Sequence, residues 1–247
     1  MRNLLLLILL TGLIIQTTVP AQSQTEAKSE SFQHANEILM KMSNYLAGTD
    51  HFSFSNTMSE DRLFTKDYYL QSEVRTDVTI RRPDKVYVDI SSDYNHKRFW
   101  YDGQKITLLT VPANFYATAE ANGKIDEMID FVYDNFGVQI PMATLAFEDP
   151  YAALMEGVVD GYYTGLHNVK GVSCHHLLFI NEDAEWQIWI EDGAQSVPRK
   201  YAVKYAMDGI EYRFTAFIDN WDFNPNTPDE MFNFVAPPES GVIEFVK

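Results

Sequence analysis

The chain contains a single cysteine, Cys174, so no disulfide can form within it. Small exported domains usually depend on paired cysteines when their hydrophobic core is too small to hold the fold. This chain has 247 residues, of which 46% are hydrophobic and 14% are aromatic, and it can therefore build a substantial core. We expect a fold held by packing alone, with Cys174 as a buried and unreactive thiol.

Basic residues are scarce as well. The chain has 19 Lys and Arg against 35 Asp and Glu, and its formal net charge at pH 7 is −16. Such a surface repels phosphate backbones and anionic lipid heads. The composition therefore argues against nucleic acid as a partner and against docking through a polybasic patch, and it favours a soluble, acidic protein.

The familiar catalytic motifs are missing. The sequence has no glycine–serine nucleophile elbow, no phosphate-binding glycine loop and no helix with two histidines at zinc-binding spacing. His175 and His176 are neighbours on a predicted strand and point to opposite faces, so they cannot hold one metal ion together. Acid pairs such as Glu182-Asp183 are neighbours at turns, and do not face each other across a cleft. We predict no catalytic residue, no metal site and no cofactor.

The first residues follow the plan of an export signal. A basic start at Arg2 precedes an apolar run from Leu4 to Leu10, which resumes over residues 13–15. This apolar segment is about a dozen residues long, shorter than the ~20 residues that a bilayer-spanning helix needs. Val19 and Ala21 suit the positions before a cleavage site, and no cysteine follows that could carry a lipid. We predict a signal peptide over residues 1–21, cleaved after Ala21, and a mature protein free in the periplasm, or secreted if the host has no outer membrane.

The mature part divides into a short leader segment and one domain. Residues 22–30 are polar and lack periodicity, which predicts a flexible linker. From Phe32 to Leu46 the apolar residues recur every three or four positions, which predicts an amphipathic helix that Gly48 ends. We expect residues 31–247 to form a single β-rich domain.

Most of that domain shows the two-residue period of half-buried strands. Val74 to Ile80 and Val86 to Ile90 alternate with polar residues, and Pro83 lies in the turn between them. The pairs Asp102-Gly103 and Asp208-Gly209 lie between alternating runs, where a tight hairpin needs residues that accept a positive φ. Further strands are predicted over residues 98–101, 105–110, 174–180, 185–190, 201–207 and 210–218. Successive hairpins of this kind predict an antiparallel meander.

A helical insert interrupts the strands at about residues 123–157. Its first helix, residues 124–136, carries an apolar stripe that ends before Gly137, and Asp149-Pro150 signals the start of a second helix. Residues 141–147 are expected to form a short helical turn between them. The simplest interpretation is that these helices cover one face of the sheet.

Large apolar residues occur on both faces of some predicted strands. Trp186 and Ile188 point one way while Trp189 points the other. Either both faces are covered, or one face lines an apolar cavity that could hold an acyl chain. An ordinary two-layer core is the other interpretation, and the pattern alone leaves both open.

Several segments together resemble a bacterial family of predicted periplasmic proteins, domain-of-unknown-function family 2092. They are residues 81–85, 98–103, 114–118, 149–154, 174–177, 186–193 and 198–200. More distantly, the order of elements is similar to the lipoprotein carriers of the LolA and LolB type, and residues 232–237 match the terminal Phe-x-Phe-x-x-Pro strand of those carriers. The resemblance implies a strongly curved antiparallel sheet, an unclosed β-barrel with helices on its concave side, that binds acyl chains in its hollow.

We therefore expect a non-enzymatic binding or carrier protein, acting as a monomer, for a lipid, an acylated protein or another hydrophobic ligand. The expected pocket takes side chains from the helices and from one face of the sheet: Met128, Val132, Phe136, Leu154, Met155, Trp100, Tyr116, Trp186 and Tyr205. Two alternatives are a periplasmic hydrolase that assembles distant acids with His175 or His176, and a scaffold in an envelope complex.

Overall fold

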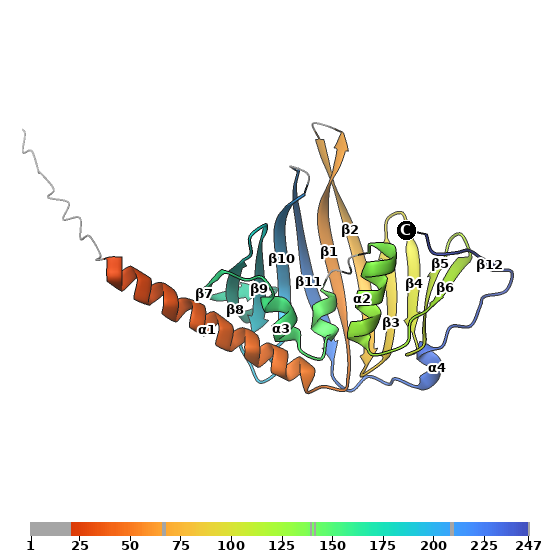
Figure 1. The fold of residues 1–247 in the computed structure, drawn as a ribbon, viewed down its shortest axis with the longest axis horizontal. Helices are drawn as coiled ribbons and strands as arrows, with labels where there is room; N and C mark the ends of the chain where they lie inside the picture. Colours follow the sequence, from red (N-terminus) through yellow and green to blue (C-terminus); the bar gives the residue numbers. More distant parts are fainter. Residues whose placement is uncertain (1–20, 66–67, 139, 141, 208–209, 247) are drawn as a thin grey trace, which may run out of the picture.

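The protein is built on one continuous sheet, seen face-on in Figure 1. The computed structural model describes residues 21–65, 68–138, 140, 142–207 and 210–246, and within them twelve strands follow one another across the sheet. The spatial order is β12-β6-β5-β4-β3-β2-β1-β11-β10-β9-β8-β7, with every neighbouring pair antiparallel except β12 and β6. The first and last strands of this order are free edges, so the sheet is open.

The strands run as follows: β1 His51–Thr65, β2 Tyr68–Arg81, β3 Lys85–Ser92, β4 His96–Tyr101, β5 Lys105–Thr110, β6 Phe115–Glu120, β7 Asp160–Val169, β8 Val172–Ile180, β9 Ala184–Glu191, β10 Pro198–Met207, β11 Ile210–Asp222 and β12 Gly241–Val242. The helices are α1 Ala21–Ala47, α2 Ile125–Phe136, η1 Ala143–Ala146, α3 Pro150–Met155 and α4 Asp229–Phe232. Helices α1, α2, η1 and α3 lie on one face of the sheet (Figure 1). The expected fold class, a curved open antiparallel sheet with helices on its concave side, is confirmed.

The hairpin around Asp102 forms as its sequence predicts. Gly103 adopts a positive φ of 87°, and the Asp102 carboxylate accepts hydrogen bonds from the backbone N–H groups of Gln104 (3.0 Å) and Lys105 (2.9 Å). This carboxylate fixes the turn between β4 and β5. The second predicted hairpin turn, at residues 208–209, lies outside the described residues.

The side-chain alternation sets which face becomes the core. Ile80 pairs with Val86 and Val78 with Val88, so both strands turn their β-branched side chains toward the helices. A smaller apolar cluster lies on the opposite face, where Cys174 packs with Trp189 and Val169. Cys174 is fully buried, as predicted, and burial raises the pKa of its thiol to about 11.

The N-terminal segment corrects one expectation. Helix α1 begins at Ala21, so residues 22–30 are helical and the predicted flexible linker is wrong. These residues include Gln, Glu, Ala and Lys, which favour a helix even without an apolar stripe. An ion pair between Lys28 and Asp160 (2.6 Å) ties this part of the helix to β7. Of the predicted signal peptide, residues 1–20 lie outside the described residues, and cleavage after Ala21 stays a prediction.

The C-terminal segment corrects another. Residues 232–237 do not form the expected terminal strand, because α4 ends at Phe232 and the chain then crosses the sheet without pairing. Phe234 instead packs on Trp100 and Tyr116, with ring centroids 5.0 and 4.7 Å apart. Among the described helices, none is both long and apolar enough to span a bilayer.

Candidate functional site

Helices α2 and α3 begin at the signals that predict them, and α2 also ends at its predicted glycine. At the start of α2, the Lys124 backbone N–H donates to the Glu127 carboxylate (2.7 Å), and at its end Gly137 takes a left-handed φ of 64°. At the start of α3, the Asp149 carboxylate accepts from the Ala152 N–H (2.9 Å). We call α2, η1 and α3, which lie over the sheet, the cover. These local signals fix where its helices begin.

The cover buries the lower half of the concave face. Met128 and Val132 of α2 and Leu154 of α3 are buried in the same cluster as Phe52 and Ile80 of the sheet. Their expected inward orientation is confirmed, whereas a role in ligand binding stays a prediction. This half is a close-packed core.

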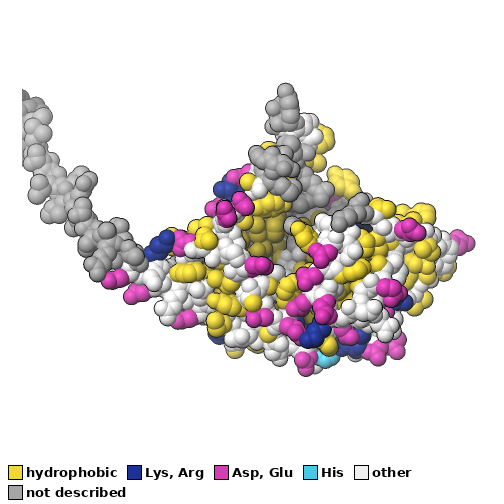
Figure 2. All heavy atoms as spheres, in the orientation of Figure 1, with side chains coloured by type: hydrophobic (Ala, Val, Ile, Leu, Met, Phe, Trp, Pro, Cys, Tyr) yellow, Lys and Arg dark blue, Asp and Glu magenta, His cyan; other side chains and the backbone are white. Residues whose placement is uncertain are grey.

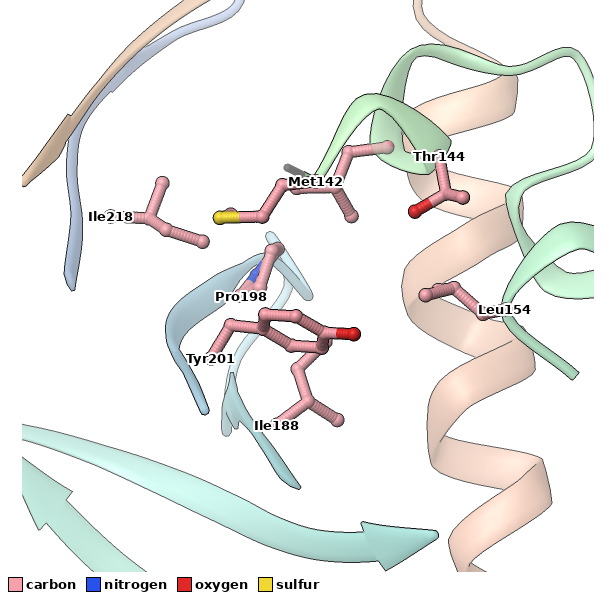
Figure 3. Close-up of a pocket in the computed structure, with 8 residues that line it drawn as sticks. Met142, Thr144, Leu154, Ile188, Pro198, Tyr201 and Ile218 are labelled. Atoms are coloured by element: carbon pink, nitrogen blue, oxygen red, sulfur yellow. The ribbon is translucent and has the colours of Figure 1, made fainter. Parts of the chain in front are cut away.

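A small cavity remains where η1 and α3 meet the sheet (Figure 3). Its interior space is about 10 Å³, close to the minimum that one water molecule needs. It is lined by Met142, Thr144, Leu145, Leu154, Ile188, Pro198, Tyr201 and Ile218. The cavity is apolar and too small for a lipid chain in this conformation.

Above the cover, the apolar face of the sheet continues uncovered. We call Met58, Val74, Tyr201, Val203 and Phe214 the uncovered row; Tyr201 lies at the border of the cover and also lines the small cavity. All five side chains are only half-buried. Figure 2 shows a hollow with a hydrophobic floor in this region, over β10 and β11. Apolar surface in a hollow on the helix-bearing face is typical of a ligand-binding surface.

The register shows that the uncovered row lies on the same face as the core. Tyr201 pairs with Ala216, and Ala216 pairs with Met58, which pairs with Val74. Since side chains two residues apart share a face, Met58 points to the same side as the buried Phe54. The row therefore continues the core toward the upper end of the sheet.

Asn56 lies between the covered and uncovered halves. It is 7% exposed, and its Oδ1 atom has no hydrogen-bond partner among the described residues. Its neighbours across the sheet are Ile218, which lines the small cavity, and Thr76. A buried acceptor without a donor costs about 1–3 kcal/mol. The position suits a ligand that brings a hydroxyl or amide N–H.

Arg82 forms a hydrogen bond to η1. Its Nη1 atom donates to the carbonyl of Ala146 (2.5 Å), and its guanidinium lies 5.6 Å from the Phe52 ring centre. The Nε and Nη2 atoms are buried and have no hydrogen-bond partner in the described part of the chain. Burial lowers the pKa of Arg82, an effect that Asp126 and Glu148 oppose. The hydrogen bond from Arg82 thus links the cover to the sheet, while the other two nitrogen donors of the same side chain have no partner among the described residues.

Two of the residues expected in the pocket lie elsewhere. Trp100 and Tyr116 point to the face opposite the helices, where they meet Phe234 and, for Trp100, Tyr87. Their placement in the pocket was wrong because a strand with aromatics on both sides does not reveal which side is inner. The partner that covers them, Phe234, is distant in sequence.

The other four expected residues lie on the helix-bearing side. Trp186 is buried and donates from its indole N–H to Asn181 Oδ1 (3.1 Å). Phe136 and Met155 are half-buried against the main core, and Tyr205 stacks on Tyr212. The sequence prediction missed the uncovered row and Met142. For Met58 and Val74, the alternation of β1 and β2 with Phe54 and Val78 was an available signal.

The two neighbouring histidines face opposite sides, as predicted. On the helix side, His175 contacts the Tyr163 hydroxyl and the Asp192 carboxylate, each at 3.2 Å. Burial, with Asp192, raises the pKa of the Tyr163 hydroxyl. On the other side His176 stacks on Trp189 at 4.0 Å, and burial lowers its pKa.

Within the described residues, no group of three or more His, Cys, Asp or Glu is placed to hold a metal ion. The features that stand out on the helix side are the uncovered row, the small cavity beneath the cover and the unpaired Oδ1 atom of Asn56.

A family model of predicted periplasmic proteins (DUF2092) matches residues 35–246 of the chain. No curated protein matches the chain significantly.

Several solved structures are similar in fold. The lipoprotein LppX of Mycobacterium tuberculosis is 11% identical, with 79% of this chain and 99% of that chain covered and a TM-score of 0.49. LprF from Mycobacterium bovis is 13% identical, with 85% and 99% covered and a TM-score of 0.45. A LolA superfamily protein from Nitrosomonas europaea is 9% identical, with 83% and 98% covered and a TM-score of 0.38.

Proposed function

The chain belongs to the DUF2092 family of predicted periplasmic proteins, and we propose that it binds a lipid or another acylated molecule on the concave face of its sheet and carries it. The observation that carries this proposal is the uncovered row, which presents half-buried apolar side chains in a hollow on the helix-bearing face. Each methylene that moves from water onto such a surface gains about 0.8 kcal/mol. An acyl chain therefore gains several kcal/mol by covering the row.

We propose that the binding site becomes larger when η1 of the cover moves. Tyr201 of the row lines the cavity under η1 and α3, together with Met142 and Leu154 (Figure 3). An unbranched methionine adapts to ligands of different shape. When η1 moves away from Arg82, the cavity and the hollow join into one apolar channel along β10 and β11.

The polar group of the ligand is proposed to lie at Asn56. A ligand with a hydroxyl or an amide N–H satisfies the unpaired Oδ1 atom, whereas a free carboxylate, which only accepts, does not. The proposed class is thus an acylated hydroxyl or amide compound, including an acylated protein. Binding and release of such a ligand need no bond-making group.

The experiment measures displacement of a monomeric fluorescent fatty amide from the purified protein, together with native mass spectrometry of protein isolated from its host. The test variant is Phe214→Asp, which places a charge in the uncovered row. The matched control is Thr215→Asp, the next residue on the same strand, whose side chain points to the opposite face. We expect Phe214→Asp to weaken probe binding at least about tenfold, which corresponds to about 1.4 kcal/mol. The control should stay near the wild-type value.

Equal weakening in both variants would show that the row does not bind the probe. Absence of probe binding by the wild type, with no co-purifying lipid, would remove the proposal altogether. In that case, assays with hydrolase substrates would test the hydrolase alternative, and pull-downs from envelope extracts would test the scaffold alternative.

A further inference from the structure

Large apolar side chains are exposed mainly at one end of the sheet. Phe64, Tyr68 and Tyr69 on the β1–β2 hairpin are 71%, 69% and 57% exposed, and Tyr94 in the β3–β4 turn is 82% exposed. Phe115, where the β5–β6 turn ends, is exposed as well. Since neighbouring strands are antiparallel, these three hairpins turn at the same end, which is the upper end in Figure 1.

The opposite end is polar. There the ion pairs Arg81–Asp229, Lys124–Glu148 (2.8 Å) and Lys85–Asp84 (3.1 Å) surround the start of α2 and the β2–β3 turn. Figure 2 shows acidic and basic side chains gathered along this lower margin, while hydrophobic ones continue to the upper margin. The exposed rings and this group of ion pairs therefore lie at opposite ends of the sheet.

We propose that the upper end of the sheet docks on the surface of a neutral, zwitterionic phospholipid bilayer, so that the ligand passes between the bilayer and the uncovered row. This inference rests on the proposed function. Tyrosine and phenylalanine rings are favoured at the level of the lipid head groups, where the ring is in apolar surroundings and a tyrosine hydroxyl stays hydrated. The exposed rings come from separate hairpins spread across the sheet, an arrangement that meets a plane more readily than a narrow groove.

The charge of the protein indicates whether a neutral or an anionic bilayer is the better partner. The chain carries a net charge of −16, which repels anionic lipids. Lys204 and Arg213 face each other across β10 and β11 near their hairpin, and both are engaged with acids: Lys204 with Glu185 (3.3 Å) and Glu211 (3.4 Å), and Arg213 with Glu211 (2.7 Å). A neutral surface therefore fits this end better than an anionic one.

The hollow lies close to the same end. Its floor lies over β10 and β11, and the β1–β2 hairpin rises next to it (Figures 1 and 2). Met58 and Val74 of the uncovered row lie on the same two strands as the rings of the β1–β2 hairpin, so an acyl chain that leaves the docked bilayer is proposed to move along β1 and β2 to the row.

The test is flotation of the full mature protein with phosphatidylcholine vesicles and, separately, with vesicles containing phosphatidylglycerol. The test variant is Phe64→Ser/Tyr68→Ser/Tyr69→Ser. The matched control is Met40→Ser/Leu166→Ser/Val235→Ser, which removes three side chains that are 43%, 55% and 82% exposed in other parts of the surface. Because all six positions are exposed, both variants should keep the wild-type circular dichroism spectrum and Tm.

We expect the wild type to float with phosphatidylcholine, and less with phosphatidylglycerol. Partitioning of the hairpin variant should fall at least about tenfold, and that of the control less than about twofold. Failure of the wild type to float, or equal loss in both variants, overturns the docking proposal, and a protein partner for this end would then be the alternative. Binding of the soluble fatty amide, measured without vesicles, tests the proposed function independently of docking. The hairpin variant should bind this probe as the wild type does.

Discussion

Tyr101 shows at the residue scale how a buried polar group fixes the cover over the sheet. Its side chain is fully buried, and its hydroxyl donates to the carbonyl of Gly123 (2.6 Å), just before α2. Burial, with Asp84 and Glu127 adding, raises its pKa to about 12. The neutral phenol is therefore the form that the fold stabilises.

The sign of this shift predicts a pH dependence. An unfolded tyrosine ionises near pH 10, so the stabilisation is complete below about pH 10 and is lost between about pH 10 and 12. Tyr101→Phe should cost about 1 kcal/mol at pH 8, because Gly123 loses its donor, and should make the decline above pH 10 shallower. Urea unfolding across pH 8 to 12 measures both effects. The control is Tyr133→Phe, at an exposed position, and an equally steep decline in the Tyr101 variant would contradict the assignment.

At the scale of elements, the docking of α1 on β7 depends on a missing side chain. A Cβ at Gly161 would lie 2.8 Å from Phe179 and 2.9 Å from Phe32 of α1. Next to it, the Ser31 hydroxyl accepts from the Tyr163 N–H (3.0 Å) and so reaches the backbone of the edge strand. The helix can approach this closely only because residue 161 has no side chain.

Gly161→Ala should therefore destabilise the domain by about 1–3 kcal/mol through overpacking. For a chain of this length that lowers Tm by roughly 2–4 °C per kcal/mol. Gly193→Ala is the matched control, because its Cβ would meet nothing closer than 3.6 Å. A scanning calorimeter compares the two, and equal Tm values would show that the rings move aside without cost.

The short element η1 gives a second prediction at this scale. Arg82→Met removes the bond to Ala146 and also removes two buried donors that have no partner among the described residues. Because these effects oppose each other, we expect the free energy of unfolding to change by less than about 1 kcal/mol. The amides of Leu145 and Phe147, which close η1, should exchange with solvent about tenfold faster.

Hydrogen exchange followed by NMR measures this local opening. Arg81→Gln is the control, since the neighbouring arginine pairs with Asp229 and donates to the carbonyl of Thr227, not to η1. Unchanged exchange in the Arg82 variant would mean that packing alone holds the cover.

At the scale of the whole molecule, local signals predicted most elements but not their long-range partners. The Asp102-Gly103 turn, α2 and α3 were found because a capping carboxylate or a positive-φ glycine marks each of them. Strand β1 was missed because Ser53 and Ser55 alternate with only two phenylalanines before the chain becomes polar. The residues of α1 before Phe32 carry no stripe, so only the helix itself reveals them.

The candidate site was predicted less well than the fold, for a physical reason. Periodicity says which residues share a face, and it placed Met128, Val132 and Leu154 correctly on the inner side of their helices. Which face of β4 and β6 is inner depends on Phe234, more than a hundred residues away from Trp100 in the chain. Where the cover stops, and hence which residues stay uncovered, depends on how far short helices reach across a wide sheet.

The strand order has a consequence for how the chain reaches this structure. Strands β1 to β6 and β7 to β11 are two meanders of neighbours in sequence, and they join only where β1 pairs with β11, as at Thr57 and Phe217. Each meander can form from local contacts, but the central seam has to close a loop of about 160 residues, which is slow. Until β11 arrives, the long edge of β1 stays open to pairing with other chains. The vulnerable species during biogenesis is therefore a half-assembled sheet whose exposed edge is the one that ends up in the middle of the native molecule.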